Sequence, residues 1–186
     1  MSITMMVILG IIVILILWMV GAYNRFIRLI NHAKEAWADI DVQLKRRYDL
    51  IPNLVNAVKG YATHESSAFE KVTQARAAAM GARTAGEHSK TEGVLGQAIT
   101  GLFGIAEAYP ELKANTNFLE LQKELSDTEN KIQAARRFYN GNVRDLNTSL
   151  QQFPGNVIGG MFSFKTMEFF DLDEGDVAKN PVEVKF

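Results

Sequence analysis

The sequence contains no cysteine, and this absence excludes structural disulfides, thiolate zinc sites and a thiol nucleophile. An excess of basic charge is also missing, because 20 Lys and Arg residues against 21 Asp and Glu residues give a net charge of −1. A nucleic-acid-binding chain normally carries a strong basic excess, so we expect no nucleic-acid partner. The length of 186 residues leaves room for one membrane span and one domain.

Catalytic and metal-binding motifs are missing as well. His64 and Glu65 lie in the sequence HESSA, which lacks the second histidine at i+4 that a zinc-binding helix would supply. His32 and His88 lie in unrelated segments, and GLFG at 101–104 is too short to indicate a phosphate loop. No serine elbow is present. We therefore expect a chain with no enzymatic activity, no metal and no cofactor.

Charge is absent from the first segment, Ile3 to Ala22. About 20 helical residues at ~1.5 Å each can cross a hydrocarbon core of ~30 Å. A cleaved signal peptide would have a basic start, a shorter apolar stretch and small residues before the cut, and none of these is present. Residues 1–22 are therefore predicted to be an uncleaved transmembrane anchor that contacts the lipid bilayer.

The residues after this segment are typical of a membrane interface. Trp18 and Tyr23 lie near its end, where aromatic rings favour the headgroup region, although Trp18 could also face lipid. Arg25 and Arg28 follow within a few positions. Lys and Arg tend to stay in the cytoplasm, so the N-terminus is predicted outside and the remaining chain inside, in a single-pass membrane protein.

The rest of the chain shows helical periodicity without a Gly- or Ser-rich linker after Tyr23. Apolar residues recur at spacings of three and four up to Pro52, which we interpret as either a kink or the first turn of a second helix. The apolar stripe resumes from Leu54 to Ala75 and dissolves in a predicted connection, residues 77–93. Further helices are predicted from about Val94 to Tyr109 and from about 115 to 150.

These stripes predict an all-α fold. An antiparallel, up-and-down bundle of four helices, over residues 23–154, is preferred to a kinked three-helix bundle. Residues 155–186 lose the helical period and carry four phenylalanines among glycines and acids. They are interpreted as a tail that docks on the bundle, on a partner or on lipid.

Three stretches resemble the LemA family: QLKRRYDLIPNLVNAVKGYATHE (43–65), AEAYPELKANTNFLELQKEL (106–125) and ENKIQAARRFYNGNVRDLN (129–147). The resemblance implies a bacterial single-pass membrane protein with a helical bundle and no established reaction. It also implies a location in the bacterial inner membrane. Genes of this family often neighbour those of membrane proteases or other envelope proteins, which makes such proteins candidate partners.

Lys45, Arg46 and Arg47 form a basic triplet. On a straight helix the triplet lies ~30 Å beyond Arg25, which is several Debye lengths of ~8 Å, so it can hardly interact with the anchoring membrane. It is either a solvated face or pairs with acidic residues of the last long helix or of a neighbouring subunit. Asn140 and Asn147 lie close to an apolar stripe and, if buried, would fix helix register.

Two functions are consistent with this pattern. The first is a scaffold in which many copies associate as a homo-oligomer and organise or remodel the membrane. The second is an adaptor that holds an envelope protease or another partner protein near the membrane. The size of the extracted particles would separate the two functions.

Overall fold

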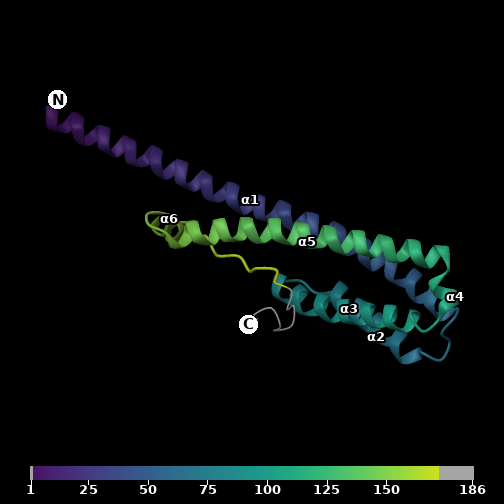
Figure 1. The fold of residues 1–186 in the computed structure, drawn as a ribbon. Helices are drawn as coiled ribbons and strands as arrows, with labels where there is room; N and C mark the ends of the chain where they lie inside the picture. Colours follow the sequence, from purple (N-terminus) through teal and green to yellow (C-terminus); the bar gives the residue numbers. More distant parts are fainter. Residues whose placement is uncertain (1, 172–186) are drawn as a thin grey trace, which may run out of the picture. The chain divides into compact units, whose positions relative to one another are not determined.

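The computed structural model describes residues 2–171, and within this range helices are the only regular secondary structure. The all-α prediction is therefore confirmed. The elements follow one another as α1 (Ile3–Lys59), α2 (Ser66–Gly81), α3 (Ala85–Ala106), α4 (Pro110–Lys113), α5 (Thr116–Gln151) and α6 (Gly155–Met161) (Figure 1). The described residues divide into two compact units. Unit 1 contains residues 2–38 and 137–167, and unit 2 contains residues 39–136 and 168–171.

Helix α1 continues through Pro52, which lies inside it. The sequence-based alternative of a new helix at Pro52 is therefore wrong, and Leu54 and Val58 belong to α1. Both side chains are fully buried, as is Ile51 before the proline. Tertiary packing on this face outweighs the lost backbone donor, because burial of each large aliphatic side chain is worth ~1.5–3 kcal/mol.

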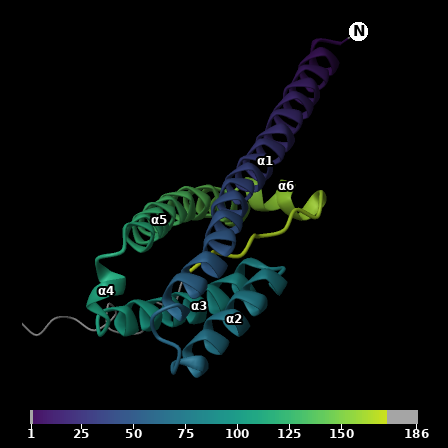
Figure 2. The same ribbon diagram turned by 90° about the vertical axis from the view of Figure 1, so that its right-hand side faces the viewer.

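The predicted connection at 77–93 is also wrong, because α2 extends to Gly81 and α3 already begins at Ala85. Only residues 82–84 separate the two helices, which lie side by side in unit 2 (Figure 2). The start of α3 is fixed by a capping box. The hydroxyl of Thr84 accepts a hydrogen bond from the Glu87 amide at 3.1 Å, while the Glu87 carboxylate accepts from the amide of Thr84 at 3.3 Å.

Helix α5 agrees with the prediction from its apolar stripe and spans Thr116–Gln151. Asn115 precedes it and accepts a hydrogen bond at its Oδ1 from the amide of Phe118, which satisfies a donor in the first turn. The buried apolar residues of α5 keep helical spacing: Phe118, Leu125, Ile132, Tyr139, Val143 and Leu146. The stripe therefore faces a core along the whole helix.

The core of unit 1 forms where α1, α5 and α6 meet. Phe26, Leu146 and Ile158 are buried together, with Leu150 and Phe164 packed against them. Trp37 and Tyr139 add an edge contact, with ring centroids 5.1 Å apart. Residues 3–18, by contrast, are exposed along their whole length.

The core of unit 2 takes side chains from four helices. Its largest fully buried aliphatic residues are Ile40, Leu44, Ile51, Leu54, Leu95, Leu102, Leu112 and Ile132. Segment 168–171 joins this unit through Phe170, which is fully buried and lies 6.4 Å from the ring of His88. The predicted tail, residues 155–186, therefore begins with a short helix, α6, which the sequence pattern did not indicate. Phe164 and Phe170 pack in units 1 and 2, and residues 172–186 lie outside the described residues.

Candidate functional site

A pocket lies in unit 1 where the apolar part of α1 ends. It has a volume of about 390 Å³, and α1 lines it with Trp18, Gly21, Ala22, Arg25, Phe26 and Arg28. The opposite wall is the end of α5 and the start of α6, with Ser149, Gln152, Phe153, Pro154 and Gly155. Three of the four predicted membrane-interface residues therefore line one pocket, which we call the boundary pocket.

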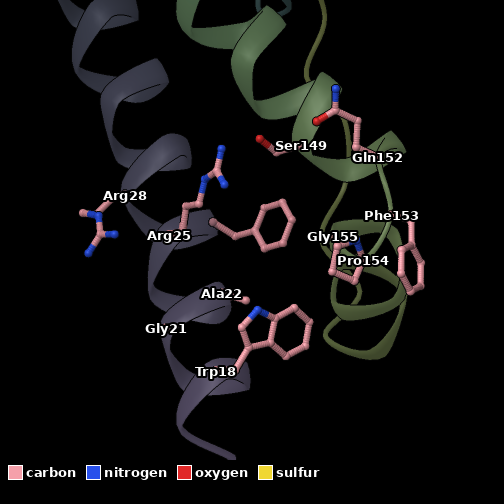
Figure 3. A pocket seen from close by; sticks show the side chains of 11 residues that line it. Trp18, Gly21, Ala22, Arg25, Arg28, Ser149, Gln152, Phe153, Pro154 and Gly155 are labelled. Atoms are coloured by element: carbon pink, nitrogen blue, oxygen red, sulfur yellow. The ribbon is translucent and has the colours of Figure 1, made fainter. Parts of the chain in front are cut away.

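The side chains of Trp18 and Arg25 project from α1 toward the α5–α6 turn, whereas Arg28 points away from it (Figure 3). Arg25 and Arg28 are exposed, and within residues 2–171 neither forms an ion pair or a hydrogen bond. An arginine presents five donors in a planar fork that suits carboxylate or phosphate oxygens. The boundary pocket therefore combines an unpaired cation with an indole and an apolar floor.

Close packing of α6 closes one side of this pocket. A Cβ atom at Gly155 would clash with the carbonyl oxygen of Ser149 and would lie 3.3 Å from the ring of Phe26. Glycine is therefore the residue that lets the start of α6 approach α5 and α1 so closely. The sequence-based reading missed Gly155, because a glycine in a Gly-rich tail gives no signal of a close approach.

Tyr23, the fourth predicted interface residue, packs against the segment after α6. Its ring lies 4.8 Å from Phe162 and 5.5 Å from Phe164, and Phe164 also lies 5.3 Å from Phe26. Asn147 binds the backbone of Met167 in the same unit. The predicted docking of this segment on the helices is therefore observed for residues 162–167.

Several apolar side chains near the boundary pocket are exposed to solvent. Phe153 is 81% exposed, and Val157, Met161 and Phe162 on and beside α6 are between 41% and 63% exposed. A cluster of exposed apolar side chains on so short a segment is typical of a surface that contacts lipid or protein.

The basic triplet separates into three environments in unit 2. Lys45 is exposed, and Arg46 lies 3.7 Å from Asp127 at the surface. Arg47 is only 3% exposed and forms ion pairs with Glu92 of α3 and Glu129 of α5, the latter at 2.5 Å. Arg47 therefore cannot form the predicted subunit contact, because its guanidinium is buried by its own chain. For Lys45 and Arg46 that contact stays a prediction.

Glu92 is the centre of this buried network. It is 2% exposed and accepts a hydrogen bond from the hydroxyl of Tyr48 as well as the ion pair from Arg47. Burial raises the pKa of Tyr48 to about 12, against the opposite influence of the Arg47 charge. The Tyr48 hydroxyl therefore stays protonated and donates its hydrogen bond to the Glu92 carboxylate. Because α1, α3 and α5 each contribute a charged group, the network fixes their register in unit 2.

His88 lies one turn before Glu92, with its Nδ1 4.0 Å from Oε1 of that carboxylate. Burial lowers the pKa of His88, because desolvation penalises the imidazolium, while the charges of Asp41 and Glu87 act in the opposite direction. His32 and His64 are exposed elsewhere. Within residues 2–171, no group of three or more His, Asp or Glu side chains is arranged to hold a metal ion.

A second, larger pocket of about 720 Å³ forms a groove between α3 and α5 in unit 2. Gly93 and Gly96 line it on α3, and a Cβ atom at either position would meet no other atom. Gln122, Asn130 and Gln133 line it on α5. Gly93 of the predicted connection and Gly96 of the third predicted helix therefore leave an open groove on this side of α3.

Glu92 was missed by the sequence-based reading because it fell in the predicted connection. A signal was present, since Glu92 precedes Leu95, Ile99 and Leu102 at spacings of three, four and three. A charged residue at a stripe position indicates a buried ion pair.

Comparisons with known proteins agree with the resemblance seen in the sequence. The sequence model of the LemA family matches residues 36–186. Two magnetosome proteins are similar: MamQ of Magnetospirillum gryphiswaldense is 22% identical over 80% of this chain, and MamQ 2 of Paramagnetospirillum magneticum is 21% identical over 80%. The chain spans 64% of the length of each. Protein LemA of Metamycoplasma hominis is 27% identical over 83% of this chain and 71% of its own length.

Proposed function

Because the chain belongs to the LemA family and carries an apolar helix long enough to cross a membrane, we propose that it is a non-enzymatic helical scaffold that self-associates and organises the bacterial membrane. The observation that carries this proposal is the continuity of α1. One unbroken helix contains the exposed apolar stretch and the buried residues Phe26, Ala33 and Ala36. Because no flexible linker separates the anchor from the rest of α1, the arrangement of the copies in an assembly can determine how their anchors are arranged in the bilayer.

The relatives support a role at a membrane. Two of them are named magnetosome proteins, and they match over most of this chain. The proposal places the protein in the inner membrane, with the N-terminus outside and the helical units in the cytoplasm, because Arg25, Arg28 and Lys34 follow the anchor. Protease added to intact cells should therefore leave the helical units uncut, and digestion there would reverse the orientation.

Lys45 and Arg46 are the charged residues that we assign to the contact between copies. Both are exposed in unit 2, and the Arg46–Asp127 pair is too open to be worth more than ~0–1 kcal/mol. Contacts repeated around an oligomer multiply small energies, so a weak pair can still control assembly. Arg47 is excluded from this assignment because it is buried.

The test measures particle mass. Full-length protein extracted in mild detergent should form particles of high mass by light scattering and electron microscopy, and Lys45→Glu with Arg46→Glu should reduce them to small species. The control reverses two other exposed lysines of unit 2, Lys71 and Lys90, for the same change in charge. A monomer or dimer in the parent protein would contradict the scaffold.

The alternative is a membrane-tethered adaptor for an envelope protease or another protein. The groove between α3 and α5 favours it, because Gly93 and Gly96 leave room there for a partner segment. An adaptor needs only a small particle, so the same mass measurement separates the two functions. Filling the groove with Gly96→Leu should then abolish partner capture from native membranes and leave particle mass unchanged.

A further inference from the structure

We propose that the boundary pocket binds the phosphate of an anionic glycerophospholipid, with Arg25 as the phosphate-binding residue. The inference rests on the membrane anchoring proposed above and adds a specific ligand to it. It is argued from the position of the pocket along α1, from its charge and from the apolar side chains around it.

The position of the pocket places Arg25 at the level of lipid headgroups. If residues 3–22 cross the hydrocarbon core, Arg25 lies three residues, or ~5 Å, beyond the core along the helix. The headgroup layer on each face is about 5–8 Å thick. Trp18, one wall of the pocket, then lies at the upper edge of the acyl chains, which is the region that indole rings favour.

The chemistry of the pocket suits a phosphate diester with acyl chains. Arg25 is exposed and has no hydrogen-bonding or ionic partner within residues 2–171. Ser149 and Gln152, on the opposite wall, add a hydroxyl and an amide that can bind polar headgroup atoms. Trp18 and Ala22 precede Arg25 by about two turns and one turn of α1, and they give the pocket an apolar part that can contact the glycerol end of the acyl chains.

The surroundings of the pocket indicate that this face lies in the membrane interface. Phe153, at 81% exposure, and Val157 and Met161 on α6 would be left in water if the α5–α6 turn were solvated. At the headgroup boundary these apolar side chains are removed from water, which is favourable, and they hold the α5–α6 turn against the bilayer. A lipid is therefore the occupant that satisfies both the free arginine and the exposed apolar side chains.

The test uses the full chain with Trp37→Phe, which leaves Trp18 as the only tryptophan. The protein is reconstituted in two sets of phosphatidylcholine vesicles that contain the same fraction of phosphatidylglycerol. In one set the phosphatidylglycerol is brominated, and in the other an equal amount of phosphatidylcholine is brominated. Bromine quenches an indole on contact, so Trp18 fluorescence reports which lipid occupies the pocket at constant surface charge.

We expect brominated phosphatidylglycerol to quench Trp18 more strongly, with a preference of about fivefold for one arginine at the membrane surface. Arg25→Gln should remove the preference. The matched control is Arg144→Gln, which changes the same charge at an exposed position of α5 outside the pocket. Far-UV circular dichroism checks that both variants stay folded.

Equal quenching by the two lipids would overturn the lipid site but leave the anchor intact. An equal loss in the Arg25 and Arg144 variants would also overturn it, because general surface charge would then explain the preference. Displacement by added inorganic phosphate would identify a free anion, and not a lipid, as the occupant. If neither lipid quenched Trp18, the membrane anchor itself, and with it the proposed function, would be refuted.

Discussion

The side-chain amide of Asn147 forms two hydrogen bonds with the backbone of Met167. Its Nδ2 donates to the Met167 carbonyl oxygen, and the Met167 amide donates to its Oδ1, both at 2.9 Å. One side chain of α5 therefore satisfies both backbone groups of a residue in the extended segment after α6. This contact explains how a stretch without regular secondary structure is held in unit 1.

Asn147→Ala should release this segment. Two hydrogen bonds at ~0.5–1.5 kcal/mol each predict a loss of ~1–3 kcal/mol in the free energy of unfolding, and the Met167 amide should exchange faster with deuterium. Asn142→Ala is the control, because the side chain of Asn142 bonds within residues 2–171 only to the Phe138 carbonyl oxygen of its own helix. Unchanged exchange at Met167 would contradict the assignment.

Tyr139→Ala should destabilise unit 1 by ~3–5 kcal/mol, because Tyr139 is 2% exposed and its ring packs against Trp37. Trp37→Ala should cost less, since Trp37 is only partly buried. The neighbouring Phe138 is 59% exposed, so Phe138→Ala provides a control with nearly the same ring. Urea unfolding of the full chain in detergent measures all three, and equal losses for Tyr139 and Phe138 would show that the stripe faces elsewhere.

Arg47→Met should cost ~3–5 kcal/mol, because it leaves Glu92 buried without its cation. Adding Glu92→Gln should restore part of the stability, since glutamine carries no charge and still accepts from Tyr48. Arg46→Met should cost at most ~1 kcal/mol, because its ion pair with Asp127 is exposed. A double variant less stable than Arg47→Met alone would argue against an uncompensated charge as the cause.

His88 should make unit 2 less stable in mild acid. Burial lowers its pKa in the folded state, so between that value and the ordinary 6.5 the unfolded chain binds more protons. Stability is therefore complete above pH 6.5 and falls as the pH drops toward the folded-state pKa, by at most ~1.4 kcal/mol per pH unit. Unfolding at several pH values should show this slope in the parent and in His64→Gln, and a smaller slope in His88→Gln.

The long helices could be predicted from sequence because their apolar stripes persist over many turns. The fourth predicted helix, 115–150, matches α5 almost residue for residue, since Asn115 caps it and the stripe from Phe118 to Leu146 has no break. The structure at Pro52 and in the segment 77–93 was harder to predict from sequence. Both contain local breakers whose cost is exceeded by burial of residues such as Leu54 and Leu95, and burial depends on contacts distant in sequence.

The site could be predicted only in part for a similar reason. Aromatic and basic residues after an apolar segment predict a membrane interface, and this pattern selects Trp18, Arg25 and Arg28, which the structure places along one pocket. Their partners in the boundary pocket, Ser149 and Gly155, lie more than a hundred residues away, and no local pattern connects them. The Glu92–Arg47 pair also joins two different helices, and it buries Arg47 while its neighbours Lys45 and Arg46 stay exposed.

The unbroken path of α1 from Ile3 to Phe26 and beyond also has a mechanical consequence. Tilting is one way in which a transmembrane helix adapts to a bilayer thinner than its apolar segment. In a chain with a flexible linker that tilt would end at the membrane surface, but here Met19, Ala22 and Phe26 already pack against α5, α6 and the segment that follows. If α1 spans the membrane as proposed, the thickness of the bilayer sets the tilt of α1 and with it the angle between unit 1 and the membrane surface.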